Sequence, residues 1–202
     1  VQRFLLENLD IRGAVVHLDS VWQQMLSDRH YPQPVTQLLG EMSATTLLLG
    51  DNLKQTGRLT IQLNGSGPVS MLVIDCNEDL QIRGMAKCAQ HIEPQSVPEL
   101  IGHGQLLITL DMPSMRESYQ SIVPRDGDSI AEIFQHYFKQ SEQLPSRLFL
   151  ITTNQSIFGL LLQKLPAAAQ QDPDGLARAE ALAATILDQT LLGLTAEEML
   201  TR

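Results

Sequence analysis

The stretch that decides the fold spans residues 35–49 and reads VTQLLGEMSATTLLL. Its apolar residues recur at the helical period from Val35 to Leu49. The remaining face is hardly polar either, because Glu41 is the only charged residue in the stretch. A helix that is uncharged nearly all round is buried on all sides. We therefore expect this helix to lie between two layers of structure. The alternative is a helix that rests on one sheet with a wide apolar stripe.

Short apolar or alternating runs, separated by turn residues, surround this helix and predict strands. They cover residues 59–63, 69–75, 80–86, 106–110, 119–123, 148–151 and 157–162, and the segment 3–18 mixes strand-like alternation with a break at Gly13. The connections include NGSGP at 64–68 and Asn-Glu-Asp at 77–79, which are hairpin turns. Connections this short join antiparallel neighbours.

Two further helices begin at residues with capping-box spacing, Ser20 with Gln23 and Ser129 with Glu132. Together these patterns predict an α+β fold: mainly antiparallel sheets packed around a buried helix, in β/α/β layers, followed by a C-terminal amphipathic helical arm.

The amino-acid composition changes after Leu165. Residues 166–175, PAAAQQDPDG, are typical of a linker. We therefore predict a core domain at 1–165 and a linker with a helical arm at 166–202. The apolar stripe of the arm gives the candidate interface residues Leu176, Ala183, Ile186, Leu187, Leu191 and Leu194. This stripe either docks on its own domain or is an interaction surface for self-association or a regulated partner.

The chain ends with TAEEMLTR, in which Thr195 and Glu198 again have capping-box spacing. A helix that stops one to two turns later is marginal alone. We therefore expect the natural protein to continue past Arg202.

Charge and hydropathy limit the classes of binding partner that we expect for this chain. The net charge of −9 over 202 residues repels phosphate backbones, so we expect no nucleic acid partner. No apolar run reaches the roughly 18 residues of a membrane span, so we expect no membrane partner and a cytoplasmic location.

Catalytic and metal-binding patterns are missing from the sequence. Cys76 and Cys88 have no metal-ligand spacing, the five histidines are scattered, and no nucleophile elbow occurs. A hairpin centred on Asn77–Asp79 places the two cysteines roughly 26 Å apart along the sheet, whereas a disulfide needs Cα atoms within about 7 Å. We therefore predict two independent thiols, no catalytic residue and no cofactor in this chain.

Five motifs occur in this order along the chain: RFLLENLDIRG at 3–13, YPQPV at 31–35, GSGP at 65–68, IRGMA at 82–86 and YFKQSEQLPSRLF at 137–149. Together they resemble the heat shock protein 33 family of redox-regulated bacterial chaperones. The resemblance implies an ATP-independent holdase that binds unfolding client proteins under oxidative stress. It also implies a zinc-binding switch domain with four cysteines in CxC and CxxC spacing, which is absent here, so zinc is expected only in the full-length protein.

The released arm of such a fragment could dock on a second chain, so we expect a homodimer with exchanged arms. Two rival functions stay open from the residues alone. A small-molecule enzyme of unassigned reaction requires a deep pocket with converging polar groups. A structural dimerisation module requires a large, fixed apolar interface and no client binding.

Overall fold

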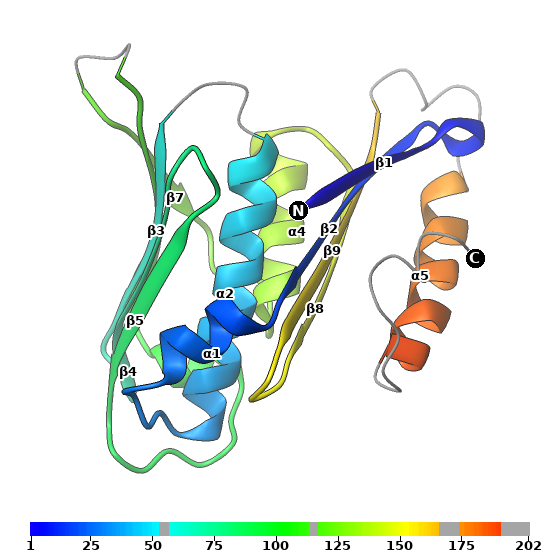
Figure 1. Cartoon of the computed structure of the whole chain (residues 1–202). Helices are drawn as coiled ribbons and strands as arrows, with labels where there is room; N and C mark the ends of the chain where they lie inside the picture. The colour runs from blue at the N-terminus through cyan, green and yellow to red at the C-terminus, as the bar shows by residue number, and fades with distance from the viewer. Residues whose placement is uncertain (53–56, 114–116, 166–173, 191–202) are drawn as a thin grey trace.

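Two antiparallel sheets enclose a layer of helices in the computed structural model, which describes residues 1–52, 57–113, 117–165 and 174–190 (Figure 1). The four-stranded sheet has the order β1-β2-β9-β8, and the five-stranded sheet has the order β5-β4-β3-β6-β7. The central helix α2 (Gln33–Asn52) contacts both sheets, and α4 (Ile130–Ser141) packs beside it. The predicted α+β class and its β/α/β layering are confirmed.

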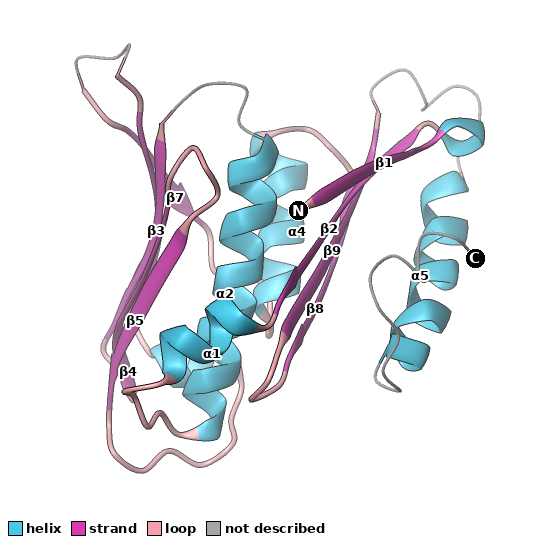
Figure 2. Ribbon diagram, viewed as in Figure 1, coloured by secondary structure: helices cyan, strands magenta, loops and turns pink. Residues whose placement is uncertain are grey.

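The first sheet is built from the two ends of the core. Its strands are β1 (Gln2–Leu6), β2 (Ile11–Leu18), β8 (Ser146–Thr152) and β9 (Ile157–Lys164), and β2 pairs with β9 from Ile11↔Lys164 to Leu18↔Ile157. The second sheet takes its strands from the middle of the chain: β3 (Arg58–Gly65), β4 (Val69–Cys76), β5 (Ile82–Cys88), β6 (Gly104–Asp111) and β7 (Tyr119–Val123). Short helical segments fill the connections: η1 (Glu7–Leu9), α1 (Ser20–Leu26) and α3 (Val97–Ile101) (Figure 2).

Helix α2 is buried on both sides, which confirms its expected position between the layers. Three buried hydroxyls of this helix have hydrogen-bond partners within the helix itself. Those of Ser43, Thr45 and Thr46 donate hydrogen bonds of 2.7–2.8 Å to backbone carbonyls one turn earlier. Gly40 lets the helix approach β8: a Cβ atom there would lie 2.4 Å from Cγ2 of Thr152. Any other residue at this position would force the Thr152 side chain to move, so glycine permits the close packing.

The β4–β5 hairpin differs from the predicted register. Cys76 pairs with Ile82 and Cys88 with Val69, so the connection covers residues 77–81 rather than the three residues Asn77–Asp79. The longer turn includes Leu80 in the left-handed region, at φ 57°. Val69 and Cys76 are seven positions apart on β4, or about 23 Å at strand rise. Both thiols are free, as predicted.

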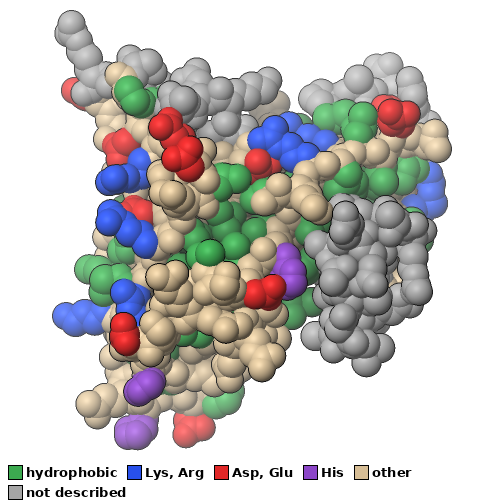
Figure 3. All heavy atoms as spheres, viewed as in Figure 1, with side chains coloured by type: hydrophobic (Ala, Val, Ile, Leu, Met, Phe, Trp, Pro, Cys, Tyr) green, Lys and Arg blue, Asp and Glu red, His purple; other side chains and the backbone are tan. Residues whose placement is uncertain are grey.

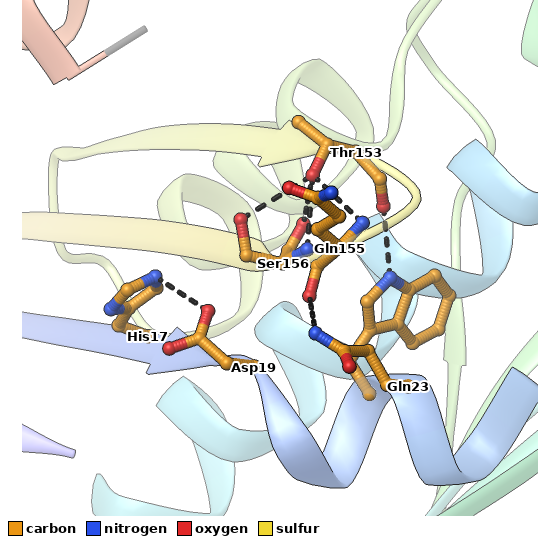
Figure 4. A network of polar contacts seen from close by, with 7 residues as sticks. His17, Asp19, Gln23, Thr153, Gln155 and Ser156 are labelled. Carbon is orange, nitrogen blue, oxygen red and sulfur yellow. Dashed lines mark hydrogen bonds and ion pairs between the residues drawn. The ribbon is translucent and has the colours of Figure 1, made fainter. Parts of the chain in front are cut away.

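The start of α1 also differs from the expectation. Ser20 is the first helical residue, and Asp19 occupies the N-cap without a side-chain bond. Gln23, expected to close a capping box, donates instead to the carbonyl of Gln155 over 3.1 Å. Trp22 Nε1 donates to the carbonyl of Thr153 over 2.9 Å, so α1 is fastened to the β8–β9 turn (Figure 4).

The predicted cap of α4 is present, since the Ser129 hydroxyl accepts from the backbone N–H of Glu132. The Glu132 carboxylate accepts from the backbone N–H of Asp128 rather than from that of Ser129. A complete capping box, unforeseen in the sequence, joins Ser96 and Glu99 at the start of α3.

Candidate functional site

An apolar surface lies on the outside of the four-stranded sheet, on the face opposite α2. It consists of Ile11 and Val15 of β2 with Phe158, Leu160 and Leu162 of β9, all at most 7 % exposed. We call this set the outer face. Strand β9 also supplies Leu161 to the main core, so it is apolar on both sides. A strand reads as a continuous apolar run when both of its faces are covered.

Helix α5 (Gly175–Thr190) lies against this outer face (Figure 1). Leu176, Ala179 and Ala183 are buried against it, 3–7 % exposed, at the spacing of one helical stripe. Leu182 lies on the other side of the helix and is 62 % exposed. The described part of the arm, α5, therefore docks on its own domain in this structure.

One ion pair joins the helix to the edge of the sheet. Arg147 Nε of β8 lies 2.6 Å from Glu180 Oε2 of α5, and the two side chains are 38 % and 41 % exposed. Arg147 also donates through Nη1 to the carbonyl of Ser146. A pair this exposed contributes about 0.2–1 kcal/mol, so it orients the helix more than it holds it.

The described residues of α5 include fewer large apolar side chains than the outer face beneath them. Three side chains of the described part of α5 are buried, and among them Leu176 is the only large aliphatic one; a fully buried leucine contributes about 1.5–3 kcal/mol. Each alanine contributes less, roughly the 0.8 kcal/mol of one buried methylene. The outer face beneath holds five large apolar side chains. Among the described residues of α5, Leu176 therefore contributes most to docking on the outer face.

The predicted interface residues fall into three groups. The structure places Leu176 and Ala183 on the outer face. Ile186 and Leu187 belong to α5 by their backbone, but their side chains lie outside the described residues, as do Leu191 and Leu194 altogether. The residues of the outer face itself were not among the predicted interface residues. The unbroken apolar run of β9 was the available signal, because it requires a cover on both faces.

A hollow of about 290 Å³ opens between the two layers where α4 ends. Figure 3 shows apolar side chains gathered between the layers and charged ones toward the margins. Burial raises the pKa of Tyr137 and of Glu142 here, and the nearby Arg12 guanidinium partly offsets the rise for Glu142. The Tyr137 hydroxyl donates to Ser121 Oγ over 3.3 Å. This hydrogen bond joins two hydroxyls and gives neither of them a base.

The described residues contain no group of three or more His, Cys, Asp or Glu side chains placed to hold a metal ion. They therefore do not fit a zinc site. Within the same ranges, no helix is both long and apolar enough to cross a membrane.

The comparisons with known proteins agree with this architecture. The Hsp33 protein family model matches residues 1–202. The 33 kDa chaperonin of Methylobacillus flagellatus is 40% identical over 204 residues, covering 100% of this chain and 70% of that protein. That of Pectobacterium carotovorum is 42% identical over 207 residues, covering 99% and 70%.

A crystal structure of the 33 kDa chaperonin from Thermotoga maritima has the same fold, with a TM-score of 0.77 at 20% identity. The match covers 98% of this chain and 72% of that one. The resemblance noted in the sequence is thereby confirmed at the level of the family, whose members are chaperones and not enzymes. The chain belongs to the Hsp33 family.

Proposed function

We propose that this chain is an ATP-independent holdase that binds unfolding proteins on the outer face of its four-stranded sheet. In the resting state α5 covers that face, and clients gain access when α5 leaves it. The observation that carries the proposal is that the outer face is covered by a helix that is not part of the main core: the described contacts of α5 are Leu176, Ala179 and Ala183, and all three lie in the separate cluster on the outer face.

A holdase must keep apolar surface covered until clients need it, because large exposed apolar patches cause aggregation. It must also uncover that surface without unfolding its core. Docking of α5 on the outer face satisfies both conditions, since the main core between the sheets contains none of its described buried side chains, Leu176, Ala179 and Ala183. These three described side chains contribute a few kcal/mol to docking.

We also propose that residues 1–165 form the core and that residues 166–202 form the linker and arm. The relatives are longer than this chain, which covers 70% of the Methylobacillus protein. We propose that a zinc- and disulfide-based switch outside residues 1–202 controls the arm during oxidative stress in the cytoplasm. No step at the outer face requires a metal.

The proposal includes a homodimer in equilibrium with the monomer. If α5 leaves its own outer face, the same face of a second chain offers the same contacts, and the reciprocal exchange closes as a twofold dimer. The rival reading as a fixed dimerisation module uses this surface too, but it requires that clients do not bind there.

The test is the turbidity of a heat-unfolding client enzyme, without ATP or oxidant, in the presence of the 202-residue chain or a chain ending at Leu165. We expect the full chain to suppress aggregation and to show some dimer by light scattering. The shorter chain should stay folded and should lack the dimer that depends on the arm. A full chain that is inert toward the client counts against the holdase, and a shorter chain that remains dimeric removes the arm from the dimer.

A further inference from the structure

The sheets have four edge strands, and two of these are blocked by side chains. At β5, the Arg29 guanidinium donates to the carbonyl of Gly84, and the backbone N–H of Ala86 donates to the Tyr31 hydroxyl over 3.1 Å. At β8, the backbone N–H of Leu148 donates to Gln135 Oε1 over 3.2 Å. Side chains therefore occupy backbone positions that an additional strand would need.

The edge strand β1 is protected in another way. The guanidinium of Arg3 forms an ion pair with Asp51 at 2.5 Å, so this strand carries a charged side chain that is tied to the end of α2. Charged residues placed on an edge strand discourage pairing with other chains.

Strand β7 has neither kind of protection. Its sequence, YQSIV, contains no charge and no proline, and Tyr119 and Ile122 are 57 % and 62 % exposed. It pairs with β6 on one side. On its other side, no described residue supplies a hydrogen bond to the main chain of Tyr119–Val123. Alternate N–H and C=O groups of this strand are therefore free to pair with another backbone.

A row of mostly apolar side chains crosses the solvent-facing side of the five-stranded sheet from this edge. Ile122 of β7 pairs with Leu107 of β6, which pairs with Gln62 of the central strand β3. On the other side of Gln62, Val73 of β4 pairs with Met85 of β5. Met85 is 43 % exposed, and Val73 and Leu107 are half-buried. A strand added at β7 would place every second side chain next to Ile122 on this face.

We propose that the β7 edge binds an extended apolar segment of an unfolding client as a sixth strand of the sheet. The inference rests on the proposed holdase function and adds a second client site, on the other sheet from α5. Free backbone groups recognise any extended chain, and the neighbouring apolar row favours apolar residues, so unrelated clients can share the site.

A second copy of this chain is a poorer occupant of the same edge. The five residues of β7 span about 17 Å. Two such strands paired edge to edge bury much less than the roughly 1,000 Å² typical of a stable interface. A client segment does not need that area at β7 alone, because the proposed function gives the same client a second site on the outer face.

The test compares Ile122→Lys with Met85→Lys in the full 202-residue chain. Both add one positive charge at an exposed position of the same sheet face, but Met85 lies on the blocked edge β5. The probe is a fluorescent, uncharged eight-residue peptide of alternating valine and threonine, measured by anisotropy. A second peptide has the same sequence with all of its inner backbone amides N-methylated.

We expect Ile122→Lys to weaken binding of the first peptide at least tenfold and Met85→Lys to change it less than twofold. The methylated peptide should bind at least tenfold more weakly than its parent. Equal binding by the two variants, or by the two peptides, overturns the edge site. A loss of dimer mass in Ile122→Lys would identify a second copy as the occupant and also overturn it. Client turbidity with the unchanged protein, run in parallel, tests the holdase function separately.

Discussion

Replacing Leu176 by alanine should loosen α5 without unfolding the sheets beneath it. Leu176 is 7 % exposed and packs on the outer face, where it is the largest side chain that α5 buries among the described residues. Its removal costs docking about 1.5–3 kcal/mol, so the ratio of undocked to docked arm should rise about 10- to 100-fold. In the main core a leucine-to-alanine change would lower global stability by about 2–5 kcal/mol. Here the loss is limited to the free energy of docking.

Hydrogen exchange followed by mass spectrometry measures this effect directly. Amides of α5 should exchange faster in Leu176→Ala, whereas those of α2 should keep their protection. The melting temperature of the core should stay within about 2 °C, because local opening does not reach the global transition. Client aggregation should be suppressed more strongly than by the parent chain in the absence of oxidant.

Leu182→Ala is the matched control, since it shortens the same side chain in the same helix at a position that is 62 % exposed. It should change neither α5 exchange nor client binding. If Leu176→Ala leaves α5 exchange unchanged, the described contacts do not hold the arm. If it lowers the melting temperature of the whole core, α5 is an integral part of the fold rather than a removable cover.

Three further predictions concern the core. Leu39→Asp puts an unpaired carboxylate at a fully buried position of α2 and should lower the melting temperature by about 10 °C; unchanged melting would contradict the sandwiched helix. Burial raises the pKa of Glu41, and a hydrogen bond from Gln37 only partly opposes this. The parent therefore loses stability as pH rises through that raised pKa, and in urea titrations the advantage of Glu41→Gln should grow between pH 4 and 7; parallel pH profiles would refute it. Burial raises the pKa of Cys76 to about 11 and also raises that of Cys88, so peroxide should affect client binding of the parent and of the Cys76→Ser, Cys88→Ser variant equally.

Local patterns predicted most of the elements and the neighbouring strand pairs. The absence of charge around α2 identified the central layer, and short turns identified hairpins such as β8–β9. The register of β4–β5 was wrong because the turn is longer than its strongest local signal, with Leu80 in a left-handed conformation. Gln23 matched a capping pattern but bonds across space to Gln155, which a spacing rule does not detect.

The candidate site could be predicted only in part, for a reason of topology. The apolar stripe on the arm lies within one helix, so its period was visible in the sequence. The surface that it covers is formed by β2 and β9, whose residues 11–15 and 158–162 come from opposite ends of the core. Pairing between strands so distant in sequence leaves no local pattern.

The most direct measurement of the central claim is to lock α5 onto the sheet. Arg147 and Glu180 face each other at 2.6 Å, so Arg147→Cys and Glu180→Cys, with Cys76 and Cys88 replaced by serine, can be joined by a short bismaleimide. A denaturing gel distinguishes cross-links within one chain from those between exchanged chains. We predict that the chain locked within itself no longer suppresses client aggregation, whereas the same variant capped with N-ethylmaleimide does. Full suppression by the locked chain would contradict the proposal that clients bind beneath α5.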